Sequence, residues 1–134
     1  MDDGSLARYA DAIVRDGLQI GPGDVLAVHP EPIQRDFVVA LTEAGYRAGA
    51  RYVDVLEDDP RITRARALLA PEDTLDWRPA WQDARMRELV REGAGIIWIA
   101  GSEAPHVLAD VPPARAVRRV IDRPGLTPYR RAVV

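Results

Sequence analysis

The alternation of strand-like and helical segments is the feature that most constrains the fold of this chain. Strand-like runs lie at residues 25–28, 52–56 and 96–99. The segments between and around them carry apolar residues at helical spacing, at about 32–48, 62–69 and 81–91. Strands joined by helical crossovers pair in parallel, and helices then cover both faces of the sheet. The sequence therefore predicts a three-layer α/β fold with a mostly parallel sheet and Rossmann-like or flavodoxin-like crossovers.

Glycines mark the expected helix ends. Gly17, Gly49 and Gly93 each close a helical pattern shortly before a strand-like run. The first helix is expected over residues 6–14, with Ser5 as its N-cap and Gly17 as a left-handed stop. A further helix is expected from about Pro113 to Ile121.

The length fits one domain. With 134 residues, 47% hydrophobic and 29% charged, the chain has the composition of an ordinary globular protein. We assign residues 1–123 to a single α/β domain. Residues 124–134 are interpreted as the start of a connection to a missing C-terminal metal-binding domain.

Absent residue types exclude several chemistries. The chain has no cysteine, lysine or asparagine, and all 18 basic residues are arginine. A thiolate nucleophile, a phosphate-loop lysine and a Schiff-base lysine are therefore excluded. The net charge of −3 and the pI near 5.4 argue against a nucleic-acid partner. An acidic N-terminus and the lack of a long apolar run predict a cytoplasmic protein with no membrane partner.

Acidic and histidine side chains follow each predicted strand, where open α/β sheets bind ligands. The candidates in this crevice are His29, Glu31, Glu57, Asp58, Asp59, Glu103 and His106. Such side chains suit a metal ion or an α-ammonium group, whereas phosphates would be repelled. The simpler interpretation, which we favour, is that Asp58 and Asp59 turn the chain and cap the next helix. No residue is assigned as catalytic, as cofactor-binding or as a metal ligand.

Three other features have simple structural interpretations. Ser102 and His106 lie four residues apart but without a nucleophile elbow, so we do not expect a catalytic pair. Trp77 and Trp81 are expected to be packing anchors, whereas exposed tryptophans at these positions would indicate an interface. We expect Arg115, Arg118 and Arg119 to form a solvated face.

Two stretches carry a recognisable pattern: LARYADAIVRDGLQIGPGD at residues 6–24 and YRAGARYVDVL at residues 46–56, the latter followed by Asp58 and Asp59. The segments 70–72 and 77–81 add to it. Together they resemble the thermophilic metallo-aminopeptidases of the aminopeptidase T and aminopeptidase S type. The resemblance covers nearly all of this chain but only the N-terminal third of a family member.

The resemblance implies a hydrolase that releases N-terminal amino acids from peptide substrates, uses two divalent metal ions and forms a homodimer. It also implies that the metal ligands lie in a second domain, because no position here matches those motifs. This chain alone is then expected to bind no metal and to be inactive. Two alternatives stay open: a stand-alone, non-catalytic α/β module for binding or dimerisation, and a small-molecule-binding domain.

Overall fold

A computed structural model describes residues 2–99, 101–102, 104–119 and 131–133 of the chain. Its sheet contains four parallel strands in the order β2-β1-β3-β4. The strands are β1 (Val25–His29), β2 (Tyr52–Val55), β3 (Gly95–Trp98) and β4 (Arg131–Val133). The predicted α/β fold with a parallel sheet is confirmed. Sequence analysis did not predict β4.

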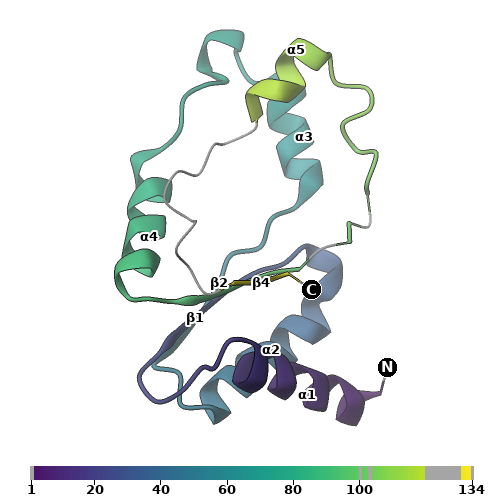
Figure 1. Cartoon of the computed structure of the whole chain (residues 1–134). Coiled ribbons are helices and arrows are strands. Elements are labelled where there is room, and N and C mark those ends of the chain that lie inside the picture. Colours follow the sequence, from purple (N-terminus) through teal and green to yellow (C-terminus); the bar gives the residue numbers. More distant parts are fainter. Residues whose placement is uncertain (1, 100, 103, 120–130, 134) are drawn as a thin grey trace.

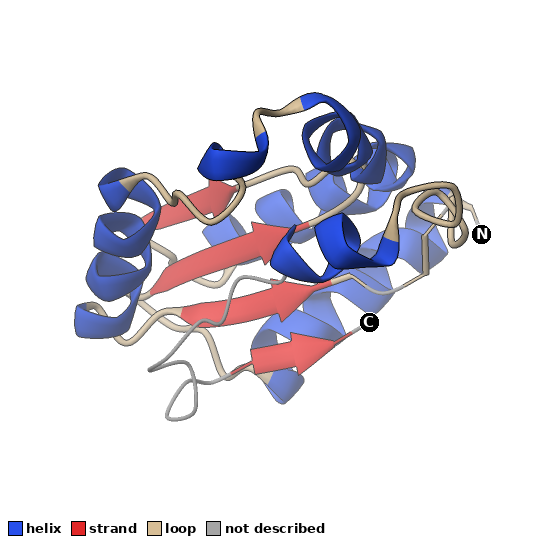
Figure 2. Cartoon of the chain, turned by 90° about the horizontal axis from the view of Figure 1, so that it is seen from above, coloured by secondary structure: helices blue, strands red, loops and turns tan. Residues whose placement is uncertain are grey.

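Helices cover both faces of the sheet, as Figures 1 and 2 show. The α-helices are α1 (Asp3–Asp11), α2 (Arg35–Arg47), α3 (Pro60–Leu69), α4 (Ala80–Arg91) and α5 (Pro113–Ala116). Helices α1 and α2 lie on one side, and α3, α4 and α5 on the other. A π-helix, Ala12–Gly17, extends α1, and 3-10 turns lie at Pro32–Gln34, Glu72–Thr74 and Val117–Arg119. Within the described residues, no helix is both long and apolar enough to span a bilayer.

Alternate residues of the strands face the two helical layers. Leu26, Val28 and Ile97 are fully buried in the larger core, which the α1/α2 layer closes. The other face of the same strands packs Ala27 and Ile96 against α4. Strands buried on both faces must be apolar throughout, which explains why β1 and β3 could be found in the sequence.

The strand order creates a topological switch point between β1 and β3. The crossover from β1 to β2 uses α2 on one face, whereas the path from β2 to β3 uses α3 and α4 on the other. In open α/β sheets, ligands bind beyond the carboxyl ends of the strands at such a point. Here the residues at that point are His29 and Trp98, which are register partners.

Helices α3 and α5 lie together, and we call residues 60–77 and 104–119 the α3–α5 lobe. Hydrogen bonds from two arginine side chains connect its segments. Arg115 donates to the carbonyl oxygens of Ala67 (2.7 Å) and Ala70 (2.6 Å), near the C-terminal end of α3. Arg118 makes a two-pronged pair with Asp76, with Nε–Oδ1 at 2.9 Å and Nη2–Oδ2 at 2.8 Å. The expected solvated arginine face is therefore wrong for both residues; the Arg119 side chain lies outside the described part.

Two predicted helix ends are corrected. Asp2, not Ser5, caps α1: its Oδ1 accepts the backbone N–H of Ser5 at 2.7 Å. Gly17 is not a left-handed stop, because the π-helix continues through it and the positive φ falls on Gln19, at 56°. Gly49 and Gly93, which were predicted to close helical patterns, do follow helices, and they adopt positive φ, at 101° and 64°.

Two further expectations concern the tryptophans and the last helix. Trp77 and Trp81 are not packing anchors: they are 62% and 69% exposed and contact each other edge to face at 6.1 Å between ring centroids. The last predicted helix begins at Pro113 as expected, with α5 over Pro113–Ala116 followed by a 3-10 turn over Val117–Arg119. The expected end at Ile121 lies outside the described residues.

Candidate functional site

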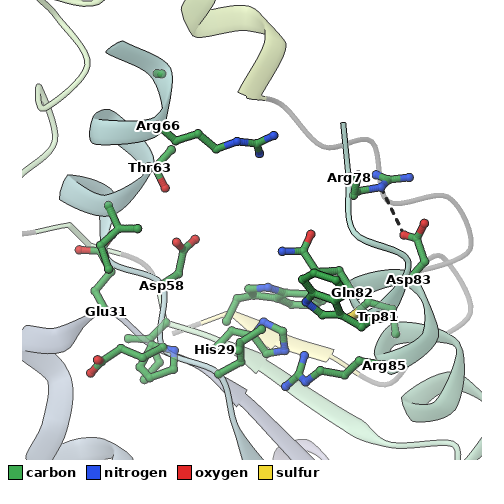
Figure 3. A pocket seen from close by; sticks show the side chains of 18 of the residues that line it. His29, Glu31, Asp58, Thr63, Arg66, Arg78, Trp81, Gln82, Asp83 and Arg85 are labelled. Atoms are coloured by element: carbon green, nitrogen blue, oxygen red, sulfur yellow. Dashed lines mark ion pairs between the residues drawn. The ribbon is translucent and has the colours of Figure 1, made fainter. Parts of the chain in front are cut away.

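A cleft of about 710 Å³ lies at the carboxyl ends of β1, β2 and β3. Helix α3 forms one side and α4 the other, and their polar side chains face each other across the space in Figure 3. The residues of the strand ends that line it are His29, Pro30, Glu31, Leu56, Glu57, Asp58, Trp98 and Ile99. The helices contribute Ile62, Thr63, Arg66, Trp81, Gln82, Asp83, Arg85 and Met86, among others. Four of the seven candidate residues named from the sequence, His29, Glu31, Glu57 and Asp58, thus line one cleft.

The base of the cleft is aromatic. His29 is 8% exposed and its ring lies 5.2 Å from that of Trp98, measured between centroids. Trp98 also packs against the core cluster that contains Leu89 of α4. Two aromatic rings thus lie at the switch point.

Glu31 and Asp58 are brought side by side by backbone pairing beyond the strand ends. The backbone N–H of Leu56 donates to Val28 O (3.0 Å), and that of Asp58 donates to Pro30 O (2.8 Å). These bonds continue the β1–β2 ladder past both strands, so residues 27 positions apart meet at one edge. Both residues line the cleft.

Only one oxygen of the Glu31 carboxylate accepts a hydrogen bond within the described part of the chain. It accepts the backbone N–H of Gln34 while the Gln34 side chain accepts the N–H of Glu31 at 2.8 Å, a capping box at the start of the turn before α2. Its other oxygen, Oε2, is buried and has no hydrogen-bond partner in the part of the chain described. A buried acceptor without a donor is costly, so Oε2 requires a donor from solvent or a ligand.

Asp59 has a structural role. Its Oδ1 accepts the backbone N–H of Arg61 at 2.9 Å, which makes it the N-cap of α3. The Arg61 guanidinium also binds both carboxylate oxygens, and this hydrogen bonding holds the pKa of Asp59 below its ordinary value. The cap of α3 is thus Asp59, whereas Asp58 lies in the turn before it, is exposed and lines the cleft. Glu57 also lines the cleft and is exposed.

The arginines around the cleft are held by other groups. Arg85 pairs with Asp54 of β2, and Arg78 Nε lies 3.4 Å from Asp83 Oδ1. Arg66 donates to the carbonyl oxygen of Trp77 at 2.7 Å, and Arg115 holds the end of α3 as described above. The lining thus combines anchored guanidinium groups with the Glu31–Asp58 carboxylate edge.

The remaining candidates lie in a neighbouring cleft of about 480 Å³ that shares Glu31 and Asp58 with the first. Its lining includes His106 and Ser102. Ser102 Oγ accepts the backbone N–H of Ala104 at 3.1 Å, which is a turn contact. Glu103 lies outside the described residues.

The described candidates do not converge on one point as metal ligands. Within the described residues, no group of three or more histidine, aspartate or glutamate side chains could hold a metal ion. His29 lines only the first cleft and His106 only the second. Divalent ions bound by protein normally need several such ligands converging on one point, so the residues present do not fit a catalytic metal centre.

Sequence reasoning missed the aromatic and arginine part of the site. Trp98 could have been found, because it ends β3 on the face shared with Ile96, next to His29 of β1. Arg66, Arg85 and Trp81 give no such signal. Their places depend on how α3 and α4 stand over the sheet, which local periodicity does not determine.

Comparison with known proteins identifies relatives along almost the whole chain. The family profile described as thermophilic metalloprotease (M29) matches residues 2–131. Aminopeptidase T of Thermus thermophilus is 38% identical over 116 residues, which is 85% of this chain and 28% of that protein. Aminopeptidase 2 of Geobacillus stearothermophilus is 29% identical over 130 residues, 96% of this chain and 31% of that protein.

A solved structure shows the same fold. Wild-type AmpT from Thermus thermophilus matches with a TM-score of 0.78 and 34% sequence identity, over 87% of this chain and 29% of that one. The chain therefore spans less than a third of the length of these relatives.

Proposed function

This chain belongs to the thermophilic metalloprotease family M29, and on that premise we propose that it is the N-terminal domain of a metal-dependent aminopeptidase. The observation that carries the proposal is the structural match to AmpT, which covers 87% of this chain but 29% of the relative. We infer that the complete protein releases N-terminal amino acids from peptides. Two divalent ions, a homodimer and a cytoplasmic location belong to the same proposal.

The proposed role of this chain is that of a scaffold and a wall of the peptide-binding space. The buried parallel sheet gives a rigid base, since β1 and β3 are packed on both faces. The cleft at the strand ends is the part of the surface available for substrate contact. The described residues lack a convergent set of metal ligands. We therefore assign the metal chemistry to the rest of the protein and propose that this chain alone is inactive.

A chimera tests this proposal. The matching first part of Thermus thermophilus aminopeptidase T is replaced by this chain, and metal-dependent release of leucine from a leucyl substrate is measured. We expect a folded, active chimera. A matched chimera carrying Ile97→Asp, which places a charge in the core of the domain, should lose activity together with folding. A well-folded chimera without activity would contradict the proposed role.

The alternative is a stand-alone, non-catalytic α/β module for binding or dimerisation, which the cleft of about 710 Å³ favours. The reading frame after Val134 separates the two. A continuing frame rich in Glu, His and Asp supports the enzyme domain, and a stop codon supports the module.

A further inference from the structure

The cleft combines a switch-point location, an aromatic base and a carboxylate edge. His29 and Trp98 mark the carboxyl ends of β1 and β3, between which the crossovers change face. We propose that this cleft is a binding site for a primary ammonium group carried on an apolar body, with the ammonium at Glu31 and Asp58. The site goes beyond the proposed scaffold function, because the 134-residue chain should bind such a ligand without a catalytic domain.

The charge of the ligand follows from the groups that still need a partner. Glu31 Oε2 is buried without a donor in the described part of the chain, and the Asp58 carboxylate lies on the same cleft wall. Two cationic groups are paired with carboxylates, Arg85 with Asp54 and Arg78 with Asp83. Arg66 and Arg115 are held in place by neutral backbone carbonyls. Glu31 Oε2 thus still needs a donor. An ammonium group supplies three N–H bonds and a positive charge to two acceptors.

The body of the ligand follows from the apolar lining. Trp81 is 69% exposed, Ile62 is 71% exposed and Leu56 is 45% exposed, and all three line the cleft. Trp98 and Met86 continue this surface toward the sheet. Burying an aliphatic group against such side chains is favourable because it removes apolar surface from water. The faces of indole rings also attract organic cations. A strongly hydrated ion without an apolar part would use none of this surface.

A phosphate ligand fits less well. The turn that begins after β1 is Glu31-Pro32, which puts a carboxylate and a residue without an N–H where phosphate-binding folds place glycine amides. Carboxylates at short range also repel phosphate. The same groups that disfavour an anion favour a cation.

The test is calorimetric titration of the purified chain at low salt with four small probes of similar apolar size. L-leucinamide and 3-methylbutylamine carry an ammonium group, N-acetyl-leucinamide is neutral, and 4-methylpentanoate is an anion. We expect the two amines to bind and to shift the tryptophan fluorescence, because Trp81 and Trp98 line the cleft. The neutral and anionic probes should bind at least about tenfold more weakly. Equal binding of all four probes, or preference for the anion, would overturn the proposal.

The two amines distinguish the sources of the ammonium group. Tighter binding of L-leucinamide supports a peptide N-terminus as the natural ligand, and equal binding supports a simple alkylamine. Both outcomes support the ammonium site. Failure of both amines to bind overturns it and leaves the chimera experiment unaffected.

Three variants locate the site. Glu31→Gln keeps the acceptor for the Gln34 N–H but removes the charge, and Asp58→Asn removes the neighbouring charge. Each should weaken amine binding by about tenfold. Asp59→Asn is the matched control: it removes a carboxylate one residue away that caps α3 and lines neither cleft. Unchanged affinity in the folded Glu31 and Asp58 variants, or an equal loss in the Asp59 variant, would contradict the assignment.

Discussion

Gly49 and Gly93 both end helices with positive φ, but their surroundings differ. A Cβ on Gly49, at φ 101°, would lie 2.9 Å from Pro22 Cα, whereas a Cβ on Gly93, at φ 64°, would meet no atom within 4 Å. Gly93→Ala should therefore lower the free energy of unfolding by only about 1 kcal/mol, which is the energy of a left-handed backbone at a residue with a Cβ. Gly49→Ala should cost about 3 kcal/mol, because the turn at Pro22 must also move. Urea unfolding of both variants measures the difference. An equal decrease in the free energy of unfolding would show that the turn at Pro22 can move without a measurable energetic penalty.

Acid sensitivity is expected from exposed aspartates that bind arginine. Hydrogen bonds from the Arg118 guanidinium lower the pKa of Asp76, and Arg64 lowers the pKa of Asp110 in the same way. A carboxyl whose pKa is lowered by folding stabilises the protein above its unfolded pKa, and this contribution is lost as the pH falls through the folded pKa.

The free energy of unfolding should therefore be nearly constant from about pH 7 to pH 5 and should fall below about pH 4. Asp76→Asn should flatten that fall, since one of the contributing carboxyls is removed. Urea midpoints at several pH values check this. A fall of unchanged size in the variant would show that the Asp76–Arg118 pair contributes nothing to acid sensitivity.

At the scale of elements, strand β3 contributes Ile97 to the core that the α1/α2 layer closes. Ile97 is fully buried there, between layers. Ile97→Asp should lower stability by about 4 kcal/mol or more, because the charge has no partner in the core. Val55→Asp is the control, since Val55 lies on β2 but is 42% exposed and the charge stays hydrated. Similar thermal midpoints for the two variants would contradict the packing of β3.

The α3–α5 lobe should respond locally to loss of an arginine. Arg115→Met removes two hydrogen bonds to carbonyl oxygens of α3, at 2.7 and 2.6 Å, while keeping the aliphatic part of the side chain. Hydrogen exchange should then quicken in α3 and α5 but not in α2, because the lobe has few buried apolar residues of its own. Arg87→Met, an exposed position on α4, is the control. Uniform loss of protection across the chain would show that the lobe and sheet unfold together.

Sequence reasoning succeeded where the pattern of residues within a single strand or helix determines the structure. Strands buried on both faces give continuous apolar runs, so β1, β2 and β3 could be placed, and Gly49 and Gly93 marked helix ends. It failed where distant segments meet. Arg115 binds carbonyls 45 and 48 residues away. Arg85 pairs with Asp54 across 31 residues. These contacts depend on tertiary placement, so the lobe and half of the cleft lining could not be predicted.

For the molecule as a whole, the family match and the site support the proposal that the metal chemistry belongs to another part of the protein. The chain spans less than a third of its relatives' length, carries a four-stranded parallel sheet with a cleft at its carboxyl edge, and shows no convergent metal ligands among its described residues. The carboxylates Glu31, Glu57 and Asp58, which follow the predicted strands, line that cleft. The sequence could not show that Asp59 caps α3 whereas Asp58 lines the cleft. The two residues are identical neighbours in one turn, and only the direction of their side chains distinguishes them.

We propose that this chain supports a metal-dependent aminopeptidase without being active by itself. The most direct measurement is leucine release from a leucyl substrate by the purified 134-residue chain, folded by circular dichroism, with zinc, cobalt, manganese or magnesium added. Thermus thermophilus aminopeptidase T serves as the positive control. We predict no release with any of the metals. Metal-dependent release of leucine by the chain alone would contradict the account.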